Sequence, residues 1–137
     1  MHPLVSHYRR GLEPVVRGPL GIAVTVGVFL AAAGIGDTPG VVMASLWVLV
    51  SGTYCLANFA CCRETHCVFT GSGWTAIGLA ALTAVSISGT GVGLLRVEAV
   101  TIAYLVVLGV GYGVEGLVAA RTGPHVLVSG DNRAEDR

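Results

Sequence analysis

The stretch G-V-V-M-A-S-L-W-V-L-V-S-G-T-Y-C-L-A-N-F-A-C, residues 40–61, decides the fold class of this chain. It contains no charged residue and is long enough for a membrane-spanning helix, which takes about 20 mainly apolar residues. The whole chain has the same character, with 12% charged residues and a mean hydropathy of +0.76. A soluble domain carries roughly 25% charged residues. The sequence therefore predicts a single-domain integral membrane protein.

Three further windows have the length and apolar character of a membrane-spanning helix. We expect four such helices at residues 19–36, 40–61, 74–95 and 98–120, and a flexible tail at residues 121–137. Helices satisfy their own backbone polar groups, as an open-ended element in lipid must. The expected fold is an all-α integral membrane protein with four transmembrane helices and short loops. The only substantial loop is expected just before Trp74, which would anchor the third helix at the membrane interface.

The distribution of arginine predicts the orientation in the membrane. All eight basic residues are Arg, and with four spans seven of them share a side with both termini and with the second connection. Arg96 falls on the other side. Cytoplasmic loops carry the excess of basic residues. We therefore expect a multi-pass protein of the inner (plasma) membrane with both termini in the cytoplasm.

All four cysteines lie in the segment C-L-A-N-F-A-C-C-R-E-T-H-C, residues 55–67. The segment also holds one of the four histidines, so the candidate metal ligands are Cys55, Cys61, Cys62, His66 and Cys67. Cytoplasmic thiols stay reduced, and clustered cysteines there indicate metal binding or redox chemistry rather than structural disulfides. The donor types suit a soft thiophilic ion, Hg(II), Cu(I) or Zn(II).

The spacing of these residues predicts different roles for them. On a helix, Cys55, Asn58 and Cys62 follow one face at positions i, i+3 and i+7. A cation such as Arg63 beside a thiol favours the thiolate. We therefore expect either that Cys62 and Cys67 capture the ion and the deeper Cys55 relays it, or that the ion moves in the reverse order. The segment lacks the paired C-x2–4-C knuckles of a structural zinc site. The alternatives are packing of cysteine as a small apolar residue and lipid acylation at the interface.

Glu115 is a charged residue well inside the fourth predicted helix. Such residues are costly in lipid and face the bundle interior or a cavity. We expect it at the depth of the cysteines, with Asn58, Arg63, Glu115 and Tyr112 as accessory residues. The carboxylate would neutralise the ion or carry a proton, and Asn58 could bond to it across helices. The alternative is an ion pair of Glu115 with Arg63 or Arg121 that only joins helices.

Glycines mark the predicted helices, above all in G-V-G-Y-G-V-E-G, residues 109–116. Small residues let helix backbones approach closely in lipid. We expect them to pack helices within one chain, with a homo-oligomer or a larger membrane complex as the alternatives. Apart from the lipid bilayer, the sequence indicates no other partner class. It has no nucleic-acid signature, no glycine-rich phosphate loop after a strand and no Ser-His-Asp arrangement.

The segment N-F-A-C-C-R-E-T-H-C-V-F-T-G, residues 58–71, resembles a segment shared by small prokaryotic four-helix membrane proteins. Their segment reads Asn-x-x-x-Cys-Arg-x-x-His-Cys-x-x-Thr-Gly. The matching positions are Asn58, Cys62, Arg63, His66, Cys67, Thr70 and Gly71. These proteins are largely uncharacterised and some are linked to mercury resistance, so the resemblance favours Hg(II). Better-known mercuric transporters carry a Cys-Cys pair in their first helix, whereas here the pair ends the second.

We therefore expect a non-enzymatic membrane protein that binds and transports a soft metal ion through its Cys/His cluster. Two alternatives belong to other classes. One is a non-catalytic subunit or assembly factor of a larger membrane complex, held by the glycine faces. The other is a membrane thiol oxidoreductase, which the absence of a C-x-x-C spacing disfavours.

Overall fold

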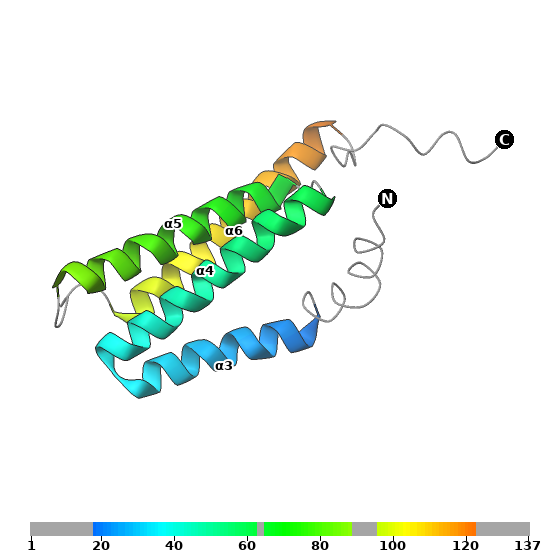
Figure 1. The fold of residues 1–137 in the computed structure, drawn as a ribbon. Helices are drawn as coiled ribbons and strands as arrows, with labels where there is room; N and C mark the ends of the chain where they lie inside the picture. Colours follow the sequence, from blue (N-terminus) through cyan, green and yellow to red (C-terminus); the bar gives the residue numbers. More distant parts are fainter. Residues whose placement is uncertain (1–17, 63–64, 89–95, 123–137) are drawn as a thin grey trace.

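The structure is a computed structural model that describes residues 18–62, 65–88 and 96–122, apart from the side chains of residues 37, 60–62, 65, 88 and 122. These residues form four helices: α3 (Pro19–Ile35), α4 (Asp37–Cys62), α5 (Thr65–Ser88) and α6 (Val97–Thr122). Figure 1 shows α4, α5 and α6 side by side, with α3 along the edge of the bundle. Successive helices run in opposite directions, so α4 and α6 end where α5 begins. The expected all-helical, four-helix fold is confirmed.

Three of the described helices have the length and composition to cross a membrane. Their apolar windows are Thr38–Phe59, His66–Ile87 and Val97–Arg121. Helix α3 is apolar but has 17 residues, which is about 26 Å of helix against a hydrocarbon core of about 30 Å. By these measures the chain is a multi-pass membrane protein whose exposed apolar side chains face lipid.

The expected loop between the second and third helices is wrong, because α5 begins at Thr65. The polar run T-G-S-G at residues 70–73 stays helical because its hydroxyl groups bond backbone carbonyls one turn earlier. Thr70 Oγ1, for example, donates to His66 O at 2.7 Å. Hydroxyl groups bonded in this way need no solvent. His66 and Cys67 therefore lie in the first turn of a helix and not in a loop.

Glycines bring α4 and α5 into close backbone contact. A Cβ at Gly52 would lie 2.6 Å from the backbone N of Thr75, and one at Gly78 would lie 3.0 Å from the backbone N of Leu49. Side chains at these positions would force the two helices apart, which is why small residues mark such contacts in lipid. The α4–α5 hairpin is the scaffold on which the polar residues near its tip are placed.

Most of the glycines expected to pack the helices are open instead. A Cβ would meet no described atom within 4 Å at Gly27, Gly34, Gly109, Gly113 and Gly116. In the run at residues 109–116, Gly111 alone is buried against another helix, where a Cβ would collide with Thr70 Cγ2 on α5. The prediction of packing within one chain is wrong for the open positions.

Trp74 lies in the core and not at the membrane interface, contrary to expectation. It is 5% exposed, its Nε1 donates to Tyr104 O at 3.0 Å, and the two rings stack with centroids 4.4 Å apart. The Tyr104 ring also contacts Phe29 of α3 at 5.3 Å. The side chains of Ser51 and Thr25 lie close to its hydroxyl group. Tyr104 therefore joins all four described helices near the middle of the bundle.

Candidate functional site

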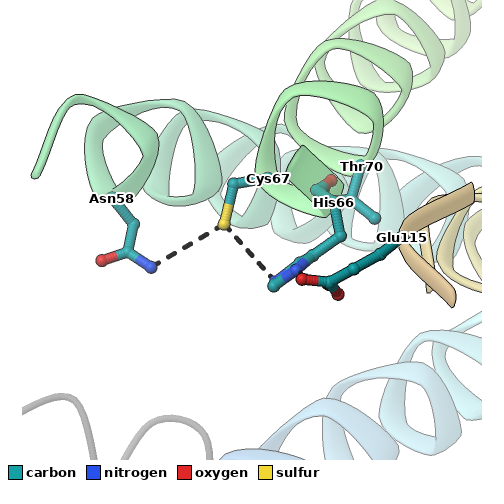
Figure 2. A network of polar contacts seen from close by, with 5 residues as sticks. All are labelled: Asn58, His66, Cys67, Thr70 and Glu115. Atoms are coloured by element: carbon teal, nitrogen blue, oxygen red, sulfur yellow. Dashed lines mark hydrogen bonds and ion pairs between the residues drawn. The ribbon is translucent and has the colours of Figure 1, made fainter. Parts of the chain in front are cut away.

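Polar side chains gather at the end of the bundle where α4 and α6 end and α5 begins. Figure 2 shows Asn58 from α4, His66, Cys67 and Thr70 from α5, and Glu115 from α6. The antiparallel course of α5 and α6 sets the last turns of α6 against the first turn of α5. Residues far apart in the sequence thereby become neighbours. We call this group of residues, together with Tyr112, the thiol site.

Cys67 lies between an amide and an imidazole (Figure 2). Asn58 Nδ2 donates to Cys67 Sγ over 3.8 Å, and Sγ lies 3.5 Å from His66 Nε2. Cys67, Asn58 and His66 are 1%, 3% and 8% exposed. The thiol is therefore a buried group with polar partners on two sides, and not an apolar residue that only fills space.

His66 is held by contacts to its ring and to its backbone. Glu115 Oε2 lies 2.8 Å from Nδ1, an ion-pair distance, although the oxygen sits off the direction of the ring N–H. The ring of Tyr112 stacks on the imidazole, with centroids 4.7 Å apart and planes 17° apart. Thr70 Oγ1 donates to the His66 carbonyl. These contacts keep Nε2 directed at Cys67.

The carboxylate of Glu115 bears on where the ring proton of a neutral His66 lies. A negative charge 2.8 Å from Nδ1 favours the tautomer with the proton on Nδ1, and in that tautomer Nε2 presents a lone pair to the thiol. The order carboxylate, imidazole, thiol is that of an activated thiol: the base takes the thiol proton and a third group orients the base. The Glu115 side chain is 38% exposed, so these three side chains extend from the buried thiol to the surface of the bundle.

The structure brings together five of the nine residues expected at the site: Asn58, His66, Cys67, Tyr112 and Glu115. Asn58, expected to reach Glu115, donates to Cys67, and the carboxylate pairs with His66. Cys55 is half-buried and packs against the apolar core. The side chains of Cys61 and Cys62, and all of Arg63, lie outside the described residues.

Sequence reasoning missed the roles of Gly111 and of the Thr70 methyl group. A side chain at Gly111 would collide with Thr70 Cγ2, so these two residues mark a close approach of α6 to α5. A signal for them exists in the spacing. Gly111 precedes Glu115 by four residues and Thr70 follows His66 by four, which puts each one turn from the ion pair on the same helix face.

Within the thiol site, the described side chains supply two soft or borderline donors, His66 Nε2 and Cys67 Sγ. Within residues 18–62, 65–88 and 96–122, no group of three or more His, Cys, Asp or Glu side chains could hold a metal ion.

No family model, no curated protein and no solved structure matches this chain. The resemblance of residues 58–71 to small prokaryotic membrane proteins therefore stays a prediction. The function has to be argued from the geometry of the thiol site.

Proposed function

We propose that this protein binds a soft metal ion between His66 Nε2 and Cys67 Sγ and carries it through the membrane. The observation that carries the proposal is a pair of donors 3.5 Å apart with a carboxylate behind the imidazole. Histidines that bind metals almost always give their second ring N–H to a carboxylate, a backbone carbonyl or water. Glu115 would be that carboxylate for His66, with Nε2 as the nitrogen that binds the ion.

The separation of the two donors suits a bent coordination. With a metal–sulfur bond of about 2.3 Å and a metal–nitrogen bond of about 2.05 Å, the donors of a tetrahedral site are about 3.5 Å apart. A linear site with the same bonds would separate them by about 4.4 Å. The observed 3.5 Å therefore favours an ion with three or four ligands: Zn(II), or Cu(I) or Hg(II) with an additional thiolate.

Cys62 is the proposed third ligand, because its thiol suits a soft ion and it follows Asn58 by four residues in the sequence. A set of two thiolates and one imidazole selects soft or borderline ions over Mg²⁺ and Ca²⁺, which prefer oxygen. Asn58 would support the ligand Cys67 without binding the ion itself, as Glu115 would support His66. Its N–H donates to the sulfur and would stabilise the thiolate that binds the ion.

Burial of the thiol favours an ion over a larger reactant, and so disfavours the oxidoreductase alternative. Cys67 is 1% exposed, and its sulfur is already bracketed by Asn58 and His66. A disulfide or quinone would have to displace these neighbours in order to reach the sulfur. A desolvated ion needs far less room, and it would take the place of the S–H···N contact.

The proposal includes an orientation and a path. With α3 as a short fourth span, both termini and the thiol site lie at the cytoplasmic face of the inner membrane, where seven of the eight arginines fall. A short span is accommodated by local thinning of the bilayer at a cost of fractions of a kcal/mol per Å. The ion would enter from the cytoplasm. Cys55, about one turn deeper than Asn58 on α4, is the next thiol along the path.

The direct test is a metal titration of the protein purified in detergent under reducing conditions. We expect stoichiometric binding of one of Zn(II), Cu(I) or Hg(II). Cys67→Ser and His66→Gln should each weaken binding by at least about tenfold, because each removes a ligand from a site of few donors. Cys62→Ser should have a similar effect.

Cys55→Ser is the matched control, since it also removes a thiol from the 55–67 segment but leaves the thiol site intact. It should leave binding unchanged and reduce metal movement into vesicles. Absence of stoichiometric binding, or an equal loss of affinity for Cys55→Ser and Cys67→Ser, would refute the proposal.

A further inference from the structure

We propose that Gly111 and Thr70 are positioning residues that hold Glu115 against His66 Nδ1, and thereby make Nε2 the nitrogen that faces Cys67. The inference deepens the proposed function and rests on it for its purpose, because Nε2 is the nitrogen that would bind the ion. In this inference, the contact between Gly111 and Thr70 determines which ring nitrogen of His66 can bind the ion. The contact itself includes neither the Cys67 thiol nor the ion.

The contact itself is close enough to set the spacing of the helices. Gly111 is buried, and a Cβ there would collide with Thr70 Cγ2 and lie 3.5 Å from His66 O. Thr70 cannot turn aside freely, because its Oγ1 donates to His66 O at 2.7 Å. The methyl group is therefore held facing α6, and only glycine at position 111 leaves room for it.

The register of the two helices links this contact to the ion pair. Gly111 and Glu115 lie one turn apart on α6, and Thr70 and His66 lie one turn apart on α5. The antiparallel helices therefore meet at two adjacent points, Gly111 with Thr70 and Glu115 with His66. A substitution that pushes the helices apart at Gly111 and Thr70 also pushes them apart at Glu115 and His66. The second contact lies only one helical turn away, about 5.4 Å along the axis.

The consequence is chemical because the tautomer of a neutral histidine follows the partner of each ring nitrogen. The negative charge of a carboxylate 2.8 Å from Nδ1 favours the tautomer with the proton on that nitrogen. Nε2 then keeps the lone pair that faces the sulfur at 3.5 Å. If the carboxylate withdraws, Nδ1 loses the group that retains its proton, and a proton on Nε2 blocks that nitrogen both as an acceptor and as a ligand.

The test reads the tautomer directly in metal-free protein. ¹⁵N-histidine-labelled protein in detergent is measured by NMR at a pH where the ring is neutral, and His66→Gln identifies the two His66 signals. The unaltered chain should show the proton on Nδ1. Gly111→Ala should move it toward Nε2. Gly111→Ala with Thr70→Ser should restore it, because serine lacks the obstructing methyl group and keeps the hydroxyl that bonds His66 O.

Gly113→Ala is the matched control, since it makes the same change on the same helix at a position with no described atom within 4 Å. It should leave both His66 signals unchanged. Glu115→Leu removes the carboxylate without touching the Gly111 contact, and it should move the proton as Gly111→Ala does. A proton that stays on Nδ1 in folded Gly111→Ala overturns the inference, whether or not Glu115→Leu moves it, as does a folded double variant that fails to restore it.

Titration with Zn(II) separates this inference from the proposed function. Groups that orient a metal ligand typically contribute 10–100-fold to affinity, so Gly111→Ala should weaken Zn(II) binding by about that factor and the double variant should recover it. If the tautomer responds as expected but no ion binds, the proposed function fails and the positioning role stands. If Zn(II) binds equally well to all variants and the tautomer is constant, the positioning role fails.

Discussion

The ring of His66 makes a different contact at each nitrogen and on one face. Glu115 pairs with Nδ1, Cys67 faces Nε2, and Tyr112 stacks on the ring. Buried polar groups are costly unless they are paired, and ionisable side chains within the membrane usually mark function. Here the pairing that permits burial also orders carboxylate, imidazole and thiol. The stability of this end of the bundle and the reactivity of Cys67 therefore depend on the same contacts.

Replacing Asn58 by leucine tests the contribution of the amide to the thiol. Leucine has a similar size, so packing should be preserved, but the N–H donor to Cys67 is lost. Loss of one such hydrogen bond costs about 1 kcal/mol, or roughly fivefold in affinity. We expect the affinity for Zn(II), measured by titration in detergent, to fall by about that factor. Ala57→Leu changes the exposed neighbouring position and should leave the affinity unchanged; equal affinities in all three proteins would rule out a role for Asn58.

At the scale of helices, α5 begins about nine residues before the start expected at Trp74. The residues from Thr65 to Gly73 include His, Thr and Ser, which lower hydropathy and suggest a loop. The structure continues the helix through them, because Thr70 and Ser72 bond backbone carbonyls one turn earlier. Trp74 illustrates the same effect. Once the helix starts at Thr65, this residue falls in the core instead of at the interface.

Substitution at Gly52 tests the packing of α4 on α5. Gly52→Ala places a Cβ 2.6 Å from the backbone N of Thr75, and neither backbone can yield without moving a helix. Overpacking of this kind costs about 1–3 kcal/mol, so the midpoint of thermal unfolding in detergent should fall. Gly27→Ala, where a Cβ meets no described atom, should leave the midpoint unchanged or raise it. A fall as large for Gly27→Ala as for Gly52→Ala would contradict the packing described here.

At the scale of the whole molecule, the thiol site depends on three helices that meet at one end of the bundle (Figure 1). Tyr104 ties the same helices to α3 near the middle of the bundle. The open glycines of α6 leave room on the outer surface of the bundle. Association through these glycines stays a prediction, either as a homo-oligomer or within a larger complex. The placement of the thiol site relative to the cytoplasm depends on whether α3 crosses the bilayer.

Reporter fusions test the proposed four-span topology. A reporter that is fluorescent only in the cytoplasm should be active at either terminus, because seven of the eight arginines then fall on the cytoplasmic side. Inserted beside Arg96, in the connection between α5 and α6, the same reporter should be inactive. An active fusion at one terminus and an inactive one at the other would show an odd number of spans, and α3 would then lie on the membrane rather than across it.

The sequence by itself determined the class of this protein and the identity of its candidate donors. Lipid admits an open-ended element only as a helix of about 20 apolar residues, so composition and window length were enough for the class. The donors were evident because every thiol falls within residues 55–67. Only the tertiary structure decided which of these side chains meet. Glu115 meets His66 and Gly111 meets Thr70 where α6 packs on α5. The four-residue spacing within each helix is visible in the sequence, but neither segment shows which residues of the other helix it will meet.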